Sequence, residues 1–306
     1  MANSSGLNRT GVLSRVTVAA ITAALVGTTT AAVAADAPQE RAASAATQPA
    51  PKASAFAAAA ASVVTPIGQL HGVDSAGDLW SYWPNGSGFN AREDVGYGWS
   101  DATRFTKGDQ NADGEFDGAW AVLASGSLYY VGWSTTPAKV GSGWGIYNSV
   151  VSAGNLGGGA ADDVLARDAA GNLYLYLGYG NGKLATRVKV GPGWQAYNQI
   201  TGKGDLNGDG KADVIARDKS GVLWLYKGTG NYKAPFAGRT KIGSGWGGYN
   251  TILSTGDVDG NGAADLLGRD AAGALWLHKG TGVASSPFKP RVKVGTSGWN
   301  SYRILF

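Results

Sequence analysis

Short runs of hydrophobic residues, separated by glycine, asparagine and aspartate, follow one another along the chain from about residue 63 to residue 306. The run Val214-Ile215-Ala216, for example, is followed by a Ser-Gly pair and then by Leu223-Trp224-Leu225. β-Branched and aromatic runs of this length, bounded by turn-forming residues, are typical of β-strands joined by tight turns. The pattern therefore predicts an all-β protein.

The predicted strands recur as one repeated unit. A third strand rich in aromatic and aliphatic residues occurs five times, at residues 78–82, 127–131, 172–177, 222–226 and 274–278. A Gly-Trp pair separates the units at intervals of 45 to 53 residues, with its tryptophan at Trp99, Trp144, Trp194, Trp246 and Trp299. Four strands in about 48 residues match one blade of a β-propeller. We therefore predict a five-bladed β-propeller over residues 63–306.

The two ends of the repeat region complement each other. The first unit, which begins near Val63, lacks the opening strand that the other units have, and residues Tyr302 to Phe306 resemble that missing strand. We expect the C-terminal strand to complete the first blade, because ring closure pairs strand edges that would otherwise be exposed. A β-sandwich with fortuitous repeats is the alternative, whereas a linear solenoid would need polar end caps that the sequence lacks.

The first 35 residues have the pattern of a secretory signal peptide. Arg9 and Arg15 precede an apolar stretch over residues 16–33, and Ala32-Val33-Ala34 fits the small-residue rule for cleavage. Residues 36–62 are rich in alanine, proline, glutamine and serine, which is typical of a disordered linker or of a pro-segment that is removed. We therefore expect a secreted, extracellular protein. An uncleaved anchor is the alternative, because the apolar stretch approaches the roughly 20 residues of a spanning helix.

Charge and cysteine content narrow the function classes. The chain has 26 basic and 22 acidic residues, and cleavage of the signal peptide would remove two of the basic ones. This near balance gives little electrostatic reason to expect nucleic acid as a partner. Because the chain has no cysteine, the exported fold depends on no disulfide. After residue 34 we expect no membrane insertion, and we expect the propeller to be monomeric.

Three acidic loops place oxygen-bearing side chains at alternate positions, with glycine where a calcium loop turns sharply. They predict about three structural Ca²⁺ sites, in which the seventh position offers its main-chain carbonyl. The predicted ligands are Asp109, Asn111, Asp113, Glu115 and Asp117; Asp205, Asn207, Asp209, Lys211 and Asp213; and Asp257, Asp259, Asn261, Ala263 and Asp265. The fourth loop has Gly157 and Gly159 at ligand positions, so we expect it to hold no metal. The alternative is that such clusters only form turns.

A second repeated constellation places aromatic and amide side chains around each Gly-Trp pair. Aromatic rings beside amides suit sugars, whose C–H faces lie on rings while their hydroxyls pair with polar groups. The predicted carbohydrate-binding residues are Trp144, Tyr147, Asn148, Trp194, Tyr197, Asn198, Trp246, Tyr249, Asn250, Trp299 and Tyr302. The alternative is that these rings pack one blade against the next. The third-strand aromatics, such as Trp80 and Trp224, are expected in the core.

The remaining repeated polar residues do not indicate catalysis. Arg167-Asp168, Arg217-Asp218 and Arg269-Asp270 recur at one position, where they form either solvated pairs or part of a ligand cleft. The two histidines, His71 and His278, have no metal-ligand spacing, and no Gly-x-Ser-x-Gly elbow follows a strand. Most acids lie in the repeated loops rather than as a unique pair. We therefore expect that the protein is not an enzyme.

Two family resemblances follow from these motifs. The loop Gly204-Asp205-Leu206-Asn207-Gly208-Asp209-Gly210-Lys211-Ala212-Asp213 resembles the FG-GAP (VCBS-type) repeat, over residues 101–280, and implies calcium in blade loops. The segment Lys241-Ile242-Gly243-Ser244-Gly245-Trp246, with the aromatic residues that follow, is similar to the tachylectin repeat over residues 70–306. That resemblance implies a five-bladed propeller that binds N-acetylated amino sugars between blades. The chain departs from tachylectins by its inserted acidic loops.

The expected function is therefore non-catalytic binding of glycans on cell surfaces or cell walls. The resemblance extends to the lectin subunits that target large secreted toxin assemblies, so the protein is also a candidate subunit of such an assembly. A calcium-stabilised propeller that binds another protein is the alternative hypothesis, and a glycoside hydrolase is the third.

Overall fold

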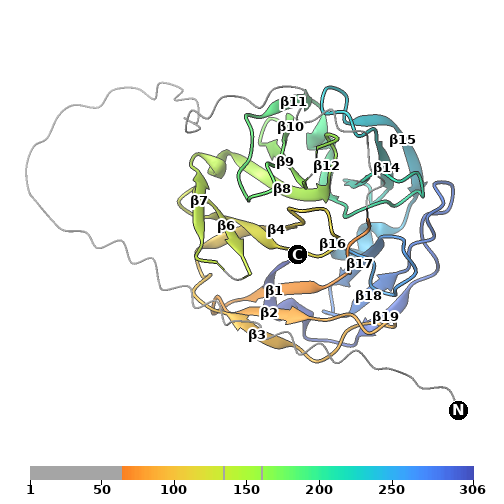
Figure 1. The fold of residues 1–306 in the computed structure, drawn as a ribbon. Coiled ribbons are helices and arrows are strands. Elements are labelled where there is room, and N and C mark those ends of the chain that lie inside the picture. Colours follow the sequence, from red (N-terminus) through yellow and green to blue (C-terminus); the bar gives the residue numbers. More distant parts are fainter. Residues whose placement is uncertain (1–63, 134, 160) are drawn as a thin grey trace, which may run out of the picture.

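The computed structural model describes residues 64–133, 135–159 and 161–306. The predicted signal peptide and linker lie outside the described residues. Five four-stranded antiparallel sheets are arranged as blades around a central axis (Figure 1), so the prediction of a five-bladed β-propeller is confirmed. None of the helical turns in the described residues has the length and hydrophobicity of a membrane span.

The strands of each blade run outward from the axis in chain order, except in the first blade. The first blade contains β20 (Tyr302–Leu305), β1 (Leu70–Asp74), β2 (Leu79–Tyr82) and β3 (Glu93–Gly96). The second contains β4 (Ala102–Gly108), β5 (Gly118–Leu123), β6 (Leu128–Gly132) and β7 (Ala138–Gly141). The third contains β8 (Tyr147–Gly154), β9 (Asp163–Asp168), β10 (Leu173–Tyr176) and β11 (Val188–Gly191). The fourth contains β12 (Tyr197–Thr201), β13 (Val214–Asp218), β14 (Leu223–Gly228) and β15 (Phe236–Gly243), and the fifth contains β16 (Tyr249–Gly256), β17 (Asp265–Asp270), β18 (Leu275–His278) and β19 (Val292–Gly295).

The C-terminal strand closes the ring as the sequence predicted. β20 pairs antiparallel with β1, with Val73 opposite Ile304 and Gly72 opposite Leu305. His71 and Phe306 exchange two backbone hydrogen bonds of 2.8 and 3.0 Å beyond the assigned strand end. The inner edge of β1 is therefore covered by a strand from the other end of the sequence, and no blade is left with three strands.

The hydrophobic core lies between neighbouring blades. Each cluster combines residues of two adjacent sheets, as where Trp120 and Val122 of the second blade pack with Val164 and Ala166 of the third. The second strand of each blade has neighbours on both faces. For this reason β5, β9, β13 and β17 contain continuous hydrophobic runs rather than an alternating pattern, and Val214, Ile215 and Ala216 of β13 are all fully buried.

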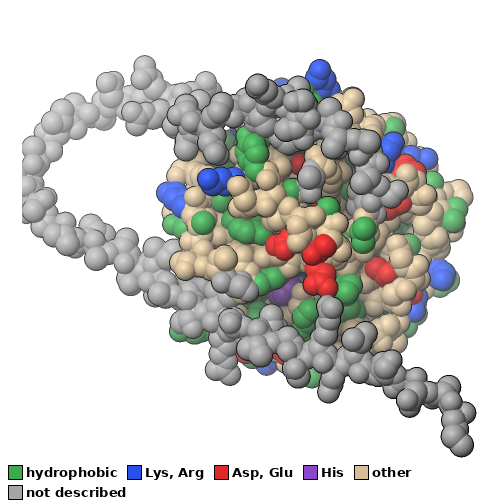
Figure 2. Space-filling view, viewed as in Figure 1, with side chains coloured by type: hydrophobic (Ala, Val, Ile, Leu, Met, Phe, Trp, Pro, Cys, Tyr) green, Lys and Arg blue, Asp and Glu red, His purple; other side chains and the backbone are tan. Residues whose placement is uncertain are grey.

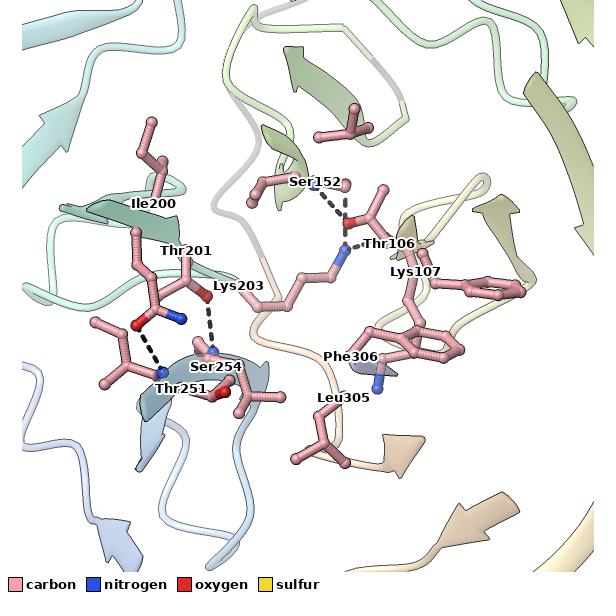
Figure 3. A pocket seen from close by; sticks show the side chains of 17 residues that line it. Thr106, Lys107, Ser152, Ile200, Thr201, Lys203, Thr251, Ser254, Leu305 and Phe306 are labelled. Carbon is pink, nitrogen blue, oxygen red and sulfur yellow. Dashed lines mark hydrogen bonds between the residues drawn. The ribbon is translucent and has the colours of Figure 1, made fainter. Parts of the chain in front are cut away.

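Five innermost strands surround the axis: β4, β8, β12, β16 and β20. Hydrogen bonds from side chains link some of these strands to the inner strand of the neighbouring blade. The backbone N–H of Ser152 donates to Thr106 Oγ1 at 2.7 Å, and that of Ser254 donates to Thr201 Oγ1 at 2.9 Å. Figure 3 shows these side chains around the axial channel. Because adjacent inner strands are not joined as one sheet, such side-chain bonds satisfy backbone groups that face the axis.

Candidate ligand-binding face and acidic loops

Each of the last four Gly-Trp pairs begins a short 3-10 turn that leads into an inner strand. The turns are η2 (Trp144–Ile146), η3 (Trp194–Ala196), η4 (Trp246–Gly248) and η5 (Trp299–Ser301). The glycine before each tryptophan has a left-handed conformation, as at Gly193 with φ 93°, which a residue with a side chain adopts only with strain. The tryptophan N–H donates to the hairpin of the preceding blade, as from Trp194 to the Gly171 carbonyl at 3.0 Å. These turns therefore link successive blades.

The aromatic rings predicted to contact sugar are packed between strands. Seven of the eight rings are buried, and Trp246 is half-buried. The four tryptophans contact a third-strand ring of their own blade, with centroids 4.6 Å apart for Trp144 and Tyr176 and 4.3 Å for Trp246 and His278. Burial favours the blade-packing interpretation of these rings, and a role in sugar binding stays a prediction.

The three asparagines predicted to bind carbohydrate are exposed, and each accepts a hydrogen bond from an arginine. Asn198 Oδ1 accepts a hydrogen bond of 3.0 Å from Arg217 Nε, and Asn148 and Asn250 accept equivalent bonds from Arg167 and Arg269. Each guanidinium also donates to two backbone carbonyls of the next blade, as Arg217 does to Trp246 (2.9 Å) and Tyr249. We call this arrangement the arginine clasp. These arginines are therefore not solvated partners of the neighbouring aspartates, and Arg167 and Arg269 also line the pocket described below.

The aspartates of the Arg-Asp motif stabilise the hairpin between the second and third strands. Asp218 accepts hydrogen bonds from the Val222 and Ser220 N–H groups and from Trp224 Nε1, at 2.9 to 3.0 Å. The bond from Trp224 is the largest of the causes that lower the pKa of Asp218 to about 2. Asp74, Asp168 and Asp270 accept the equivalent bonds from Trp80, Tyr174 and Trp276. These carboxylates are thus held by their own hairpins.

The clasp varies at two of the five blade junctions. At the junction of the first and second blades, Arg303 on the inner strand β20 reaches the carbonyls of Trp99 and Ala102. At the junction of the second and third blades, Val122 occupies the position of Arg167, since it pairs with Leu128 as Arg167 pairs with Leu173. Among the described residues no arginine donates to the Trp144 and Tyr147 carbonyls, so this junction has no clasp.

A row of arginines covers the third-strand aromatics, a feature that sequence reasoning missed. The guanidinium carbons lie 3.9 to 4.4 Å from ring centroids in the pairs Arg92–Trp80, Arg187–Tyr174, Arg239–Trp224 and Arg291–Trp276. These rings are half-buried rather than in the core as expected. The same arginines donate to the inner-strand tyrosine hydroxyls, as Arg291 does to Tyr249 at 3.0 Å. An arginine seven or eight residues before four of the five Gly-Trp tryptophans (Trp99, Trp194, Trp246 and Trp299) is the sequence signal that could have revealed the row.

One end of the axial channel opens into a pocket of about 430 Å³. It lies at the beginning of the inner strands, and its lining combines amides, hydroxyls and guanidiniums with five apolar side chains, those of Phe105, Val150, Ile200, Ile304 and Leu305. The polar lining residues are Thr103, Arg104, Asn148, Ser149, Arg167, Asn198, Gln199, Thr251, Arg269 and Arg303. We call this pocket the axial mouth. No carboxylate is part of its lining. Burial lowers the pKa of Arg104, Arg167 and Arg269.

Two buried lysines lie further along the channel, in a pocket of about 170 Å³ (Figure 3). Lys203 forms an ion pair with Asp162 and donates to the Lys107 carbonyl at 3.0 Å. Lys107 donates to the Gln69 carbonyl and lies 4.3 Å from the centroid of the Phe116 ring. Burial, and then the charge of Lys203, hold the pKa of Lys107 well below its usual value. These contacts give both ammonium groups a structural position.

The acidic loops use their first aspartate to organise the backbone. Asp205 accepts N–H groups of Asn207 (2.9 Å), Gly208 (2.7 Å) and Gly210 (2.6 Å), and Asp109 and Asp257 do the same in the other two loops. The fourth loop keeps a similar bond from Gly158 to Asn155 at 2.8 Å. The turn-forming role is therefore common to all four loops, including the one expected to hold no metal.

Carboxylates converge in one of these loops. Oxygens of Asp257, Asp259 and Asp265 lie within 4.8 Å of one another, and Asp259 also pairs with Lys279 at 3.1 Å. Burial raises the pKa of Asp265 to about 6 and that of Asp213 in the second loop to about 7. Among the described residues this is the one group of three acids with the spacing of a metal site. Asp and Glu side chains also gather near the middle of the face seen in Figure 2.

Comparison with family models supports the repeat. The family model described as FG-GAP-like repeat matches residues 160–216 and 205–268, so the chain contains FG-GAP-like repeats within its five-bladed propeller. No curated protein matches the sequence.

Three solved structures are similar to this chain at low sequence identity. A lectin, BP39L from Burkholderia pseudomallei, is 11% identical with a TM-score of 0.42, and the match covers 76% of this chain and 86% of that one. AofleA from Arthrobotrys oligospora is 9% identical with a TM-score of 0.43, covering 75% and 69%. Human WBSCR16 is 12% identical with a TM-score of 0.37, and the match covers 74% of this chain but 66% of the human protein.

Proposed function

We propose that the protein is a secreted, non-catalytic propeller that binds glycans at its axial mouth. The observation that carries this proposal is the lining of the 430 Å³ pocket, in which amide, hydroxyl and guanidinium groups come from all five inner strands or their neighbours. Sugar hydroxyls pair with fixed donors and acceptors of this kind. Asn148 and Asn198, two of the residues predicted from the sequence to bind carbohydrate, lie in this lining.

The chemistry of the mouth favours binding over hydrolysis. Glycoside hydrolysis commonly needs two carboxyl groups on either side of the bond that breaks, and the mouth is lined by none. Asp168, Asp218 and Asp270 are engaged by their hairpins, and His278 is enclosed by aromatic rings. The described residues therefore offer no acid–base pair at the mouth, which supports a lectin-like function.

A single mouth per ring fits a targeting role. One sugar site of this size gives binding of about −4 to −5 kcal/mol, which is near-millimolar. Several rings held together in a larger secreted assembly would bind a dense glycan surface far more strongly through multivalency. We therefore propose that the secreted protein acts at cell surfaces or cell walls, as a subunit that directs a larger assembly to them.

We also propose Ca²⁺ as a structural ligand of the acidic loops. The donor set of the third loop fits the ion, since hard cations prefer carboxylate and carbonyl oxygens and three carboxylates converge there. Asp257, Asp259 and Asp265 would hold the ion, with Asn261 nearby in the loop. The ion would neutralise carboxylates that burial destabilises, and the loop would gain stability. The first two loops carry the same residue types, but their carboxylate oxygens do not converge as closely as those of the third loop.

A broad glycan array with the purified protein tests the function. We expect binding to one class of glycans, and we expect Asn148→Ala combined with Asn198→Ala to weaken it by roughly tenfold or more, because sugar hydroxyls lose two partners. Asn181→Ala is the matched control, because Asn181 is an exposed amide that caps a loop away from the mouth. Absence of binding to any glycan, including peptidoglycan and teichoic-acid fragments, would overturn the proposal.

A further inference from the structure

We infer that the axial mouth is an oxyanion site, which takes the carboxylate, sulfate or phosphate group of an acidic glycan. The inference rests on the proposed glycan-binding function and specifies its ligand class. It follows from the balance of charge in the mouth, from the way in which the arginines are fixed, and from one arginine that has no part in the clasp.

The mouth concentrates positive charge without a counter-charge. Four guanidiniums, those of Arg104, Arg167, Arg269 and Arg303, line one pocket that no carboxylate enters. The ion pairs found in the described part of the chain are Lys203–Asp162 and Lys279–Asp259, and neither involves these arginines. Like charges brought together in a partly dry pocket repel one another, so a bound anion would be the missing partner.

Three of these guanidiniums are held in place by neutral groups. Arg167 and Arg269 bond to an asparagine and to backbone carbonyls, and Arg303 bonds to three carbonyls. Amides and carbonyls fix the position of the guanidinium but leave its charge uncompensated. The result is a preorganised positive rim, which loses little side-chain entropy when an anion binds.

Arg104 is the arginine that is free to bind a ligand directly. It lies on β4 in the second blade, where Val122 of β5 occupies the position of a clasp arginine. Its one side-chain hydrogen bond goes to Thr103 Oγ1 at 3.2 Å. The side chain is half-buried, so the guanidinium is partly shielded from water. A planar guanidinium with free N–H groups suits the paired oxygens of a carboxylate, sulfate or phosphate.

The rest of the lining explains why the anion belongs to a sugar. A pocket of about 430 Å³ lies within the range of roughly 300–1,000 Å³ for small-molecule sites and exceeds what a bare inorganic anion needs. Asn148, Asn198 and Thr251 add neutral donors and acceptors beside the arginines. Acidic sugars and phosphate-bearing cell-wall polymers share this combination of one anionic group and several hydroxyls.

The test compares matched neutral and charged probes by calorimetry with the full chain. The probes are glucose, glucuronate, glucose 6-phosphate, inorganic phosphate and inorganic sulfate. We expect the charged sugars to bind roughly tenfold tighter than glucose, as charge-assisted hydrogen bonds imply. That preference should shrink as salt rises from low to several hundred millimolar, because screening weakens it.

Arg104→Gln should abolish the preference for charged probes without lowering the melting temperature, because Arg104 takes no part in the clasp. Lys189→Gln, at an exposed position of β11, removes the same charge outside the mouth and should leave the preference intact. Arg104→Lys should retain part of it, since the charge stays while the planar fork is lost.

The outcomes separate the two proposals. Equal binding of glucose and its charged derivatives, or a preference that survives Arg104→Gln, would overturn the oxyanion site and leave glycan binding intact. Binding of phosphate or sulfate that depends on Arg104, without binding of any sugar, would support the oxyanion site and overturn the glycan function. No binding of any probe would overturn the inference.

Discussion

At the residue scale, His278 shows how one substitution changes a repeated contact. It pairs with Leu266 of β17. Tyr82, Tyr176 and Tyr226 occupy the equivalent position in their own blades. Those tyrosines form hydroxyl–hydroxyl bonds of 2.5 to 2.6 Å with an inner-strand tyrosine, whereas His278 Nε2 bonds to the Tyr249 hydroxyl at 2.9 Å. Burial, and then the charge of Arg291, lower the pKa of His278 to about 4. The imidazole is therefore neutral in the folded protein near neutral pH.

This lowered pKa makes stability sensitive to acid. Between about pH 6.5 and pH 4 the unfolded chain binds a proton at His278 that the folded protein does not, so the free energy of unfolding falls as pH falls. We expect His278→Tyr to remove this loss, which is about 1–3 kcal/mol at pH 4.5. Urea unfolding of both proteins at pH 7 and pH 4.5 measures it. An equal loss in both proteins would show that His278 does not contribute.

At the scale of structural elements, the loops and turns between strands carry most of the repeat-specific chemistry. The hairpins hold their aspartates, the 3-10 turns receive the arginine clasp, and the acidic loops fold around their first aspartate. The four acidic-loop sequences differ in charge but share the backbone bonds of their first residue. A metal ion would therefore add stability to loops whose shape is already set.

Calcium should stabilise the protein by an amount that depends on the third loop. With a dissociation constant of about 0.1 mM, 1 mM Ca²⁺ adds about 1.4 kcal/mol per site to the free energy of unfolding. Asp259→Asn should reduce that gain, because it removes one of the three convergent carboxylates but not the organiser of the turn, Asp257. Asp101→Asn, an exposed acid outside the loops, is the control.

Chemical unfolding with added Ca²⁺ and with chelator measures both effects. A free energy of unfolding that is the same in calcium and in chelator would contradict the structural role of the ion.

At the scale of the whole molecule, closure by β20 depends on more than one strand pairing. Tyr302 packs against Trp299 and Tyr82, and its carbonyl accepts the clasp of Arg269. Arg303 clasps the second blade, and Phe306 stacks on Phe105 with centroids 4.7 Å apart. The last five residues therefore contact the fifth, first and second blades, and they join both sides of the closing junction.

Deletion of residues 302–306 should unfold the propeller rather than loosen it. The change exposes the edge of β1, removes two clasps and uncovers core residues, a combined loss comparable with the roughly 5–15 kcal/mol stability of a whole domain. Circular dichroism and size-exclusion chromatography should show loss of the cooperative transition and aggregation. The control is Ser301→Ala, at an exposed position just before the strand. A folded monomer with an unchanged melting temperature would contradict this account of closure.

The architecture was predictable from sequence because each blade repeats the same strand and turn signals, and because residues 302–306 match the strand that the first unit lacks. The arginine clasp was not predictable, since its donor and its carbonyl acceptors lie in different blades while Arg217 and Asp218 are adjacent in sequence. The ring positions were ambiguous because the same Trp and Tyr pattern serves packing and sugar contact. The axial mouth was hidden because it unites single residues, such as Arg104 and Arg303, from strands far apart in sequence.

The order of strands in the first blade has a consequence for biosynthesis. β1, β2 and β3 leave the ribosome early, but their sheet gains its inner strand only when β20, which follows the other described strands in sequence, has been made. Until then the nascent chain presents an unpaired strand edge that other chains could join. The ring therefore cannot close before β20 has been translated, and a nascent chain that stalls before β20 keeps the inner edge of β1 unpaired.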